Sequence, residues 1–497
     1  MPQPPENEPY VQVRETHTGV VMLCGDRAYK AKKPIVTDFL DFGTHAARER
    51  ACARELELNQ RLAPDIYLGL AHVSDPLGGP AEPLLVMRRM SGATRLSSVL
   101  ADPSSEPSPL PALATTVARF HRAARRAPEI DEAGRPERLR HRWRTLLDPL
   151  AERPCPGIDP AVLARVDALA MRYIDGRPPL LDDRIAAGRI VDGHGDMLAE
   201  DIFVLPDGFR ILDCLDFDDQ LRYVDALDDA AFLAMDLEFL GHPEHARSFL
   251  DAYARAADDP APDSLRHHYI AYRATVRAKT DRVRHDQNDP AAAGNARRHL
   301  DLALRHLELG AVRLALVGGL PGTGKSTVAT RLAAEVGAVV LSSDEVRERM
   351  RAAGALSGDS GIFGAGAYTP AAKSAVYTAL LDLARERLEH GVPVILDASW
   401  TEAGERERAA SLAAETGSEL VSLHCACPPE LAHRRIRTRT GGYSEATPAI
   451  ADALAAQAAP WPEATAVDTA QPLDDSLSLA RRAWDEAPRR PAVVRHR

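Results

Sequence analysis

Residues 318–327 read Gly318-Gly319-Leu320-Pro321-Gly322-Thr323-Gly324-Lys325-Ser326-Thr327. An apolar run at 312–317 precedes this stretch, and residues 328–333 follow it with the pattern of a helix. This order predicts a strand, a glycine-rich turn and a helix start, which is the context that the phosphate-binding pattern G-x-x-x-x-G-K-[ST] requires. The fixed positions of that pattern are Gly319, Gly324, Lys325 and Ser326. The sequence therefore predicts a nucleotide-binding P-loop.

The chemistry of phosphate binding explains this spacing. Glycines let consecutive backbone N–H groups turn toward a phosphate, and the following helix adds free N–H groups and the positive end of its dipole. We expect Lys325 to reach the β- and γ-phosphates of ATP and the Ser326 hydroxyl to bind Mg²⁺. The residues expected to contact ATP are Gly319, Leu320, Pro321, Gly322, Thr323, Gly324, Lys325, Ser326 and Thr327.

The composition is that of a multidomain globular protein. At 497 residues the chain suggests roughly three folding units of about 150 residues each. No apolar run reaches the length of a membrane span, and the start, Met1-Pro2-Gln3-Pro4, lacks the basic end and apolar segment of a secretory signal. We expect a cytoplasmic protein with no membrane partner. The net charge of −11 argues against a general nucleic-acid-binding surface, but a local basic site in the C-terminal half stays open.

Two further strands are predicted after the P-loop. One ends just before Asp344 and the other ends at Asp397, with helical segments between them. Such βαβ units form a parallel sheet, in which ligands bind outside the carboxyl ends of the strands. We therefore expect Lys325, Asp344 and Asp397 to lie together, with Asp397 orienting Mg²⁺.

The tetrapeptide Asp344-Glu345-Val346-Arg347 is similar to the D-x-x-R of P-loop kinases that phosphorylate hydroxyls, including polynucleotide 5′-kinases and small-metabolite kinases. The resemblance implies that Asp344 is the base and that Arg347 binds the acceptor. Acidic residues that match the dipole of a helix N-terminus are the alternative interpretation.

Two arginines one helical turn apart, Arg435 and Arg439, lie in the predicted helix 429–439. They look like lid arginines, whose fixed donors stabilise the charge on a phosphoryl group in transfer. A solvated basic helix is the alternative for its other arginines, Arg434 and Arg437.

The N-terminal region begins with a predicted β-hairpin at 19–36, with a turn at Gly25-Asp26. A helix is predicted from 45 to 62, and Glu55 lies on its apolar face. A carboxylate among apolar neighbours needs a partner, which Lys30 or Lys32 on the hairpin could supply. A solvated helix glutamate is the alternative.

The segment His194-Gly195-Asp196, followed by a short strand and Asp216, resembles the catalytic and metal loops of aminoglycoside-phosphotransferase-like kinases, whose fold is that of protein kinases. The resemblance implies that Asp196 is the catalytic aspartate and that Asp216 binds Mg²⁺. It also implies that Lys30, paired with Glu55, holds the α- and β-phosphates.

The resemblance implies Asp216 rather than Asp213 as the metal ligand, because Asp225 and Asp229 follow it at the intervals of the family's G-D-P-x-x-D-L-A pattern, with a single insertion. The chain departs from the family's H-G-D-L-H-x-x-N pattern at Leu198, in place of the second histidine, and at Asp201, in place of asparagine. A carboxylate at 201 can bind Mg²⁺ but changes the charge of the site. Asp229 is expected to be a buried carboxylate that accepts backbone N–H bonds. Arg273, Arg277 and Lys279 lie in a predicted helix at 265–284, where we expect a solvated basic face; acceptor binding is the alternative.

The whole chain resembles bacterial fusions of an aminoglycoside-phosphotransferase-like domain to a P-loop ATP-binding kinase domain. The resemblance implies an α+β kinase-like domain at 1–309, with an N-lobe at about 1–90 and a C-lobe at about 91–309, and a parallel α/β domain at 310–497. It predicts an ATP- and Mg²⁺-dependent kinase that phosphorylates a hydroxyl of a small molecule. The alternatives are a regulatory nucleotide- or ligand-binding module in the N-terminal half, or an ATPase or polynucleotide-type kinase in the C-terminal half.

Overall fold

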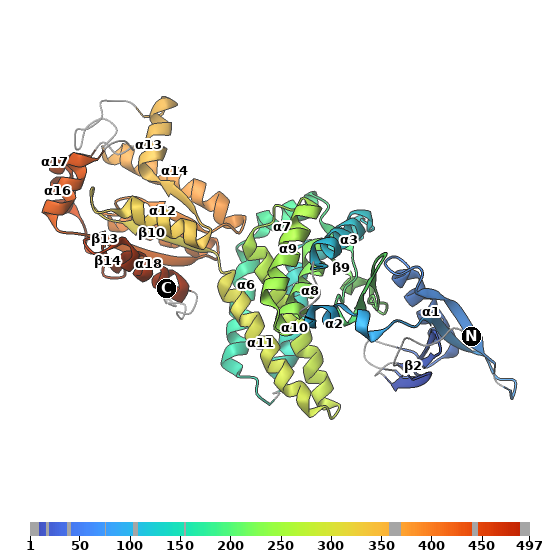
Figure 1. The fold of residues 1–497 in the computed structure, drawn as a ribbon. Helices are drawn as coiled ribbons and strands as arrows, with labels where there is room; N and C mark the ends of the chain where they lie inside the picture. Colours follow the sequence, from blue (N-terminus) through green and yellow to red (C-terminus); the bar gives the residue numbers. More distant parts are fainter. Residues whose placement is uncertain are drawn as a thin grey trace. The chain divides into compact units, whose positions relative to one another are not determined.

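The computed structural model describes residues 9–15, 19–36, 41–74, 76–102, 108–153, 156–356, 369–439 and 446–487 (Figure 1). The chain forms two compact units. Unit 1 comprises Met1–Ile158, Asp182–Ala261 and Tyr269–Ala303, and unit 2 comprises Asp159–Leu181, Pro262–His268 and Leu304–Arg497. Unit 2 thus contains segments far upstream of the predicted boundary at 309/310, which stays a prediction.

Unit 1 starts with a five-stranded antiparallel sheet in the order β1-β2-β3-β5-β4. Its strands are β1 (Val11–Glu15), β2 (Gly19–Cys24), β3 (Arg27–Lys32), β4 (Tyr67–Val73) and β5 (Glu82–Arg88). The predicted hairpin is therefore confirmed as β2 and β3. The helix α1 (His45–Asn59) contacts β4 and β5, and its N-terminus is capped by the Thr44 hydroxyl, which accepts a hydrogen bond from the Ala47 N–H.

The rest of unit 1 is mainly helical, with two short hairpins that carry the loops of interest. The strand β6 (Ile190–Asp192) pairs with β9 (Tyr223–Asp225), and β7 (Ile202–Leu205) pairs with β8 (Gly208–Ile211). The helices are α2 (Leu96–Ala101), α3 (Leu110–Ala123), α4 (Pro128–Asp131), α5 (Pro136–Glu152), α8 (Ala226–Phe239) and α9 (Pro243–Ala257). Residues of both units occur in α7 (Pro178–Ala186), α10 (Asp263–Asp286) and α11 (Pro290–Leu309).

Unit 2 contains a parallel sheet in the order β11-β12-β10-β13-β14. Its strands are β10 (Arg313–Gly318), β11 (Val339–Ser342), β12 (Val394–Asp397), β13 (Glu419–Ala426) and β14 (Thr465–Asp468). The helices of unit 2 are α6 (Pro160–Asp175), α12 (Lys325–Val336), α13 (Ser343–Ala352), α14 (Pro370–Glu389), α15 (Ala403–Glu415), α16 (Pro429–Thr438), α17 (Pro448–Gln457) and α18 (Leu473–Glu486). The predicted fold class is confirmed in its architecture: an α+β part with an antiparallel sheet precedes an α/β part with a parallel sheet.

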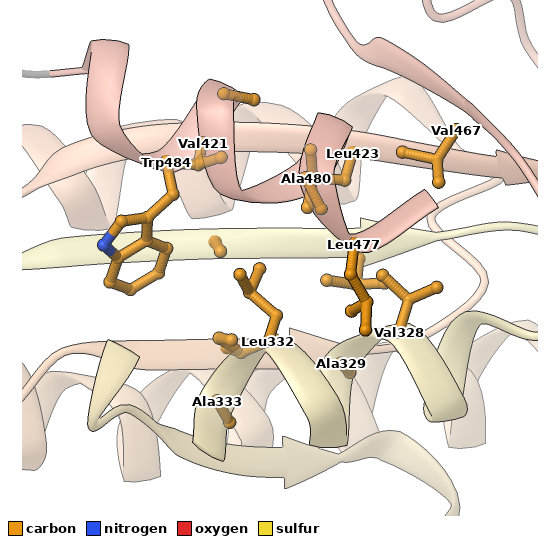
Figure 2. Packing of buried hydrophobic residues seen from close by; sticks show 14 of the residues in the cluster. Val328, Ala329, Leu332, Ala333, Val421, Leu423, Val467, Leu477, Ala480 and Trp484 are labelled. Carbon is orange, nitrogen blue, oxygen red and sulfur yellow. The ribbon is translucent and has the colours of Figure 1, made fainter. Parts of the chain in front are cut away.

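The core of unit 2 fixes the helix that begins in the P-loop. Figure 2 shows Val328 and Leu332 of α12 facing Leu477, Ala480 and Trp484 of α18 over the central strands. These side chains are almost fully buried, so the first turn of α12 has a fixed position relative to β10. Among the helices of the described ranges, none has both the length and the apolar composition needed to cross a bilayer.

Candidate functional site

The P-loop connects β10 to α12 with backbone angles that favour glycine. Gly319 has φ 146° and Gly324, which caps α12, has φ 86°. A Cβ atom at Gly319 would lie 2.4 Å from the carbonyl oxygen of Cys425 at the neighbouring strand β13. A side chain at this position would therefore displace the loop, which explains why the phosphate-binding pattern has glycine there.

The carboxyl ends of the strands bring charged side chains to this loop. Asp397 is 6% exposed at the end of β12 and accepts a hydrogen bond from the Ser326 side chain. Burial raises the pKa of Asp397 above its usual value, and nearby Asp344 adds to this shift, while Lys325 and the Ser326 hydrogen bond oppose it. The structure thus places Lys325, Ser326, Asp344 and Asp397 in one site.

Two cavities flank the P-loop, and Lys325 lines both of them. The first has a volume of about 470 Å³ and is lined by Gly322, Gly324, Lys325, Ser326, Thr327, Arg435, Arg439 and residues 469–476 in part. The second has a volume of about 610 Å³ and is lined by Gly319, Pro321, Lys325, Asp344, Arg347, Lys373, Tyr377 and residues of α17. Lys325 could therefore contact ligands in both cavities.

The two residues of the D-x-x-R segment contact each other in the second cavity. Arg347 Nη1 lies 2.5 Å from Asp344 Oδ1. Asp344 also lies in the first turn of α13, where its N–H donates to the Ser342 hydroxyl at 3.3 Å. Both interpretations of Asp344, a base in the cavity and a match to the helix dipole, are therefore compatible with its position.

The opposite wall of the second cavity was not predicted. Lys373 Nζ lies 2.6 Å from Glu402 Oε1 and 3.3 Å from the Thr401 hydroxyl, and the Tyr377 hydroxyl lies 3.3 Å from the Ser399 hydroxyl. These residues come from α14 and from the segment after β12, far from the P-loop in sequence. The sequence held one indication of this wall: lysine is rare in this arginine-rich chain, so Lys373 could have been singled out as a candidate site residue.

The two predicted lid arginines both line the first cavity. Arg435 Nη2 donates a hydrogen bond to the Thr469 carbonyl oxygen at 2.8 Å, so α16 is attached to the segment after β14. Arg439 follows the last residue of α16. The structure therefore brings Arg435 and Arg439 to the P-loop side that also holds Ser326.

In unit 1, Glu55 is buried between two lysines of β3. Its Oε1 lies 2.8 Å from Lys30 Nζ, and its Oε2 lies 2.7 Å from Lys32 Nζ. Burial opposes the charged form of Glu55, but the two lysines outweigh it and hold the pKa of this carboxyl below its usual value. The predicted need for a lysine partner is confirmed, and both candidate lysines supply it.

The two aspartates after β8 have different partners. Asp213 Oδ1 lies 3.1 Å from Lys30 Nζ, whereas Asp216 Oδ2 lies 2.6 Å from Lys32 Nζ. Asp213 has φ 63°, which turns the chain so that its carboxylate lies beside Lys30. The structure therefore brings Asp213, and not the predicted Asp216, to the lysine that was expected to hold phosphates.

The pKa shifts indicate that Asp196 and Asp201 share the surroundings of Asp213. Burial and the charge of Asp213 raise the pKa of Asp196 to about 6, against the opposing charges of Arg277 and Arg273. Burial, Asp213 and Asp196 raise the pKa of Asp201 well above its usual value. Burial and the charge of Glu55 raise the pKa of Asp216, and Lys32 opposes this shift. Asp213 therefore acts electrostatically on both Asp196 and Asp201, whereas the assignment of Asp216 as the metal ligand stays a prediction.

The loop that carries Asp196 is held by two buried groups. As expected, Asp229 accepts hydrogen bonds from the backbone N–H groups of His194 at 2.7 Å and Gly195 at 2.8 Å. Arg273 Nη1 donates to the Gly195 carbonyl oxygen at 3.2 Å, and its Nε donates to Asp228 at 2.7 Å. The expectation of a solvated face is wrong for Arg273. Its side chain is buried, because it points from α10 toward the loop that carries Asp196 and bonds to it.

The oxygen donors of Ser326 and Asp397 fit a Mg²⁺ ion that is bound partly by substrate phosphates. Within the described residues, no three His, Cys, Asp or Glu side chains form a cluster that would hold a metal by themselves. Mg²⁺ needs no such cluster, since one or two carboxylates, water and substrate phosphates complete its shell. Asp397 Oδ1 is buried and has no hydrogen-bond partner among the described residues, so it is an available oxygen beside Ser326.

Comparison with known proteins gives matches for both halves. Residues 314–461 match the family model AAA_33, described as AAA domain. A protein of Mycobacterium tuberculosis H37Rv described as uncharacterized is 48% identical over 484 residues, which cover 97% of each chain. A choline/ethanolamine kinase family protein from Mesorhizobium loti is 16% identical with a TM-score of 0.36, over 60% of this chain and 93% of that one. A sugar kinase from Janibacter sp. is 22% identical with a TM-score of 0.30, over 36% of this chain and 97% of that one.

Proposed function

This chain belongs to the family of the mycobacterial protein that it matches along nearly its whole length, and from that premise we propose that it is an ATP-dependent phosphotransferase with two kinase-type sites. The proposal includes the kinase activity of the P-loop part, its dependence on ATP, the nature of its acceptor and the activity of the N-terminal site. A cytoplasmic location belongs to the same proposal.

The observation that carries the proposal is that Lys325 lines two cavities at once. ATP would occupy the cavity with Ser326, Arg435 and Arg439, and the acceptor would occupy the cavity with Asp344 and Arg347. The γ-phosphoryl group would then lie beside Lys325 between the two ligands. A second cavity beside the same lysine supports phosphoryl transfer over ATP hydrolysis, because transfer requires space for an acceptor next to the γ-phosphate.

In the proposed step, Asp344 accepts the proton of the acceptor hydroxyl as that oxygen bonds to the γ-phosphorus. The bond from the γ-phosphorus to the bridging oxygen breaks, and ADP leaves. Lys325, with Arg435 and Arg439, stabilises the charge on the phosphoryl oxygens. Ser326 and Asp397 would hold Mg²⁺, which supplies charge neutralisation for the phosphates.

The size of the second cavity supports a small-molecule acceptor. Its volume of about 610 Å³ is within the range of small-ligand pockets, and Arg347, Lys373 and Tyr377 offer polar contacts for a hydroxylated compound. A polynucleotide 5′-kinase is the second candidate for this site, on the D-x-x-R segment alone.

For the N-terminal site we propose that Lys30 binds phosphates, that Asp196 is the base and that Asp213 and Asp201 hold Mg²⁺, with Glu55 positioning Lys30. A regulatory nucleotide-binding module remains the second candidate because of Asp201. The raised pKa of Asp201 favours its protonated form, which is a poor ligand for Mg²⁺.

The experiment is ATP turnover by the full chain with a pool of hydroxylated metabolites, compared among the parent, Lys325→Ala, Asp196→Asn and the double variant. Two active sites predict a partial loss in each single variant and complete loss in the double variant. A regulatory N-terminal site predicts that Asp196→Asn keeps full turnover. Retention of turnover in the double variant would contradict both candidates.

A further inference from the structure

Unit 1 contains a cleft of about 660 Å³ that the proposed reaction does not use. It lies between the second half of α1, the turn after that helix, α3 and the end of β6. We call it the arginine cleft, because four arginines line it: Arg54, Arg61, Arg119 and Arg125. Leu58, Leu62 and Phe120 give the same cleft an apolar side.

The positive charge of the arginine cleft is only partly balanced. Three of the four arginines have carboxylate partners: Arg54 pairs with Glu57 at 2.8 Å and with Asp219 at 3.0 Å, Arg125 pairs with Glu129, and Arg61 Nη1 lies 3.6 Å from Asp192 Oδ1, which also accepts from Arg222 Nε at 2.8 Å. Arg119 is exposed, and its guanidinium group has no ion pair or hydrogen bond with any residue that the structure describes. A concave surface with this surplus of fixed cations concentrates anions from solution.

Arg61 connects the arginine cleft to the loop that carries Asp196. Its Nη1 donates to the Asp192 carbonyl oxygen at 3.1 Å and its Nη2 to the Gly193 carbonyl oxygen at 2.8 Å. The same guanidinium group lies 5.1 Å from the centre of the Phe120 ring. An anion that binds Arg61 would compete for its hydrogen bonds to Asp192 and Gly193 and could therefore shift the backbone just before His194.

One wall of the arginine cleft is formed by α1, the helix whose Glu55 contacts Lys30. Arg54 and Leu58 flank Glu55 on α1, and Arg54 Nη2 donates to Asp219 Oδ1 at 3.0 Å. An occupant of the cleft would thus contact α1 at the turn that holds the buried Glu55 carboxylate. A small shift of this turn would change the distance between Glu55 and Lys30.

We propose that the arginine cleft binds a small organic anion with at least two negative charges, carried by carboxylate or phosphate groups, and that its binding changes the nucleotide affinity of the N-terminal site. Guanidinium groups bind both kinds of anion through paired N–H donors. The apolar side formed by Leu58, Leu62 and Phe120 would contact the carbon skeleton of the ligand. The coupling rests on the function proposed for the N-terminal site, whereas the binding does not.

Anion binding is tested by titration calorimetry on the full chain carrying Lys325→Ala, which weakens anion binding at the P-loop. Citrate serves as the carboxylate probe and inorganic pyrophosphate as the phosphate probe, both without Mg²⁺. Arg119→Gln should weaken binding of at least one probe roughly tenfold, since it removes a charged donor. Arg50→Gln, which changes an exposed arginine of α1 outside the cleft, should leave binding within about twofold.

Equal affinities for both probes in the parent, Arg119→Gln and Arg50→Gln, or no binding below about 10 mM, would overturn the anion site. The coupling is read from the ATP affinity of the same chains with and without the bound probe, and linkage requires an equal effect of ATP on the probe. An unchanged ATP affinity would overturn the coupling. A parent that binds the probe but no ATP would instead contradict the proposed N-terminal function.

Discussion

The Ser326 side chain donates a hydrogen bond to Asp397, and this contact joins the first turn of α12 to the end of β12. One oxygen of the same carboxylate has no partner among the described residues. Burial raises the pKa of this carboxyl even though the Ser326 hydrogen bond lowers it, so Asp397 would gain a partner if a divalent cation bound beside it, which supports the proposed Mg²⁺ position.

Asp397→Asn should raise the Mg²⁺ concentration for half-maximal ATP turnover roughly tenfold, because it removes the charge but keeps an oxygen that can accept from Ser326. Steady-state ATP turnover across a Mg²⁺ titration measures this. Asp382→Asn, at an exposed position of α14, is the control and should leave the titration unchanged. Identical titrations for both variants would remove Asp397 from the metal site.

Replacing Asp213 and replacing Asp216 should have different effects on the metal affinity of the N-terminal site. In full chains carrying Lys325→Ala, Asp213→Asn should weaken Mn²⁺ binding in the presence of ATP roughly tenfold. Asp216→Asn should leave it within about twofold, because Asp216 contacts Lys32. Electron paramagnetic resonance of free Mn²⁺ measures both effects, and the reverse order of effects would identify Asp216 as the ligand.

The sequence predicted the parts of these sites that depend on contiguous residues. The strand, turn and helix around Lys325 follow one another in the chain, and so do β2 and β3 with Lys30 and Lys32. Glu55 could be paired with these lysines because one buried carboxylate on an apolar helix face limits the choices. Local patterns of this kind need no knowledge of the distant packing.

The features that were missed depend on backbone angles or on distant packing. Spacing does not reveal that Asp213, with φ 63°, contacts Lys30 while Asp216 contacts Lys32. Lys373 reaches the second cavity only because α14 is folded beside β12. The strands β1 and β4 were not predicted; in β1, the two valines on one face, Val11 and Val13, are both exposed.

The rate of the N-terminal site should fall as pH falls through about 6, because the proposed base, Asp196, has its pKa raised to about 6 and acts only when deprotonated. The profile of kcat against pH, in chains carrying Lys325→Ala, measures this midpoint. Asp196→Asn should lower kcat about a hundredfold or more and abolish the midpoint. A midpoint near 4 in the parent, or one that persists in Asp196→Asn, would contradict the role of Asp196.

The packing of α6 within unit 2 predicts a stability effect far upstream of the P-loop. A Cβ atom at Gly176 would lie 2.2 Å from the Thr416 carbonyl oxygen, so Gly176→Ala should lower the free energy of unfolding of unit 2 by about 1–3 kcal/mol. Differential scanning calorimetry of the full chain measures this. Gly404→Ala is the control, because nothing lies within 4 Å of its Cβ position. Equal midpoints for both variants would remove α6 from the P-loop domain and favour the boundary at 309/310.

The central claim, transfer of the γ-phosphate of ATP to a small-molecule hydroxyl, is tested most directly by incubating the full chain with γ-labelled ATP and a cell metabolite extract. We predict that label appears in a hydroxylated metabolite, that Lys325→Ala removes most of it, and that Asp344→Asn lowers it about a hundredfold to ten-thousandfold with ATP affinity little changed. Slow release of labelled inorganic phosphate should survive Asp344→Asn better than metabolite labelling does. Label found only in inorganic phosphate, with equal losses in both variants, would contradict the claim and identify an ATPase.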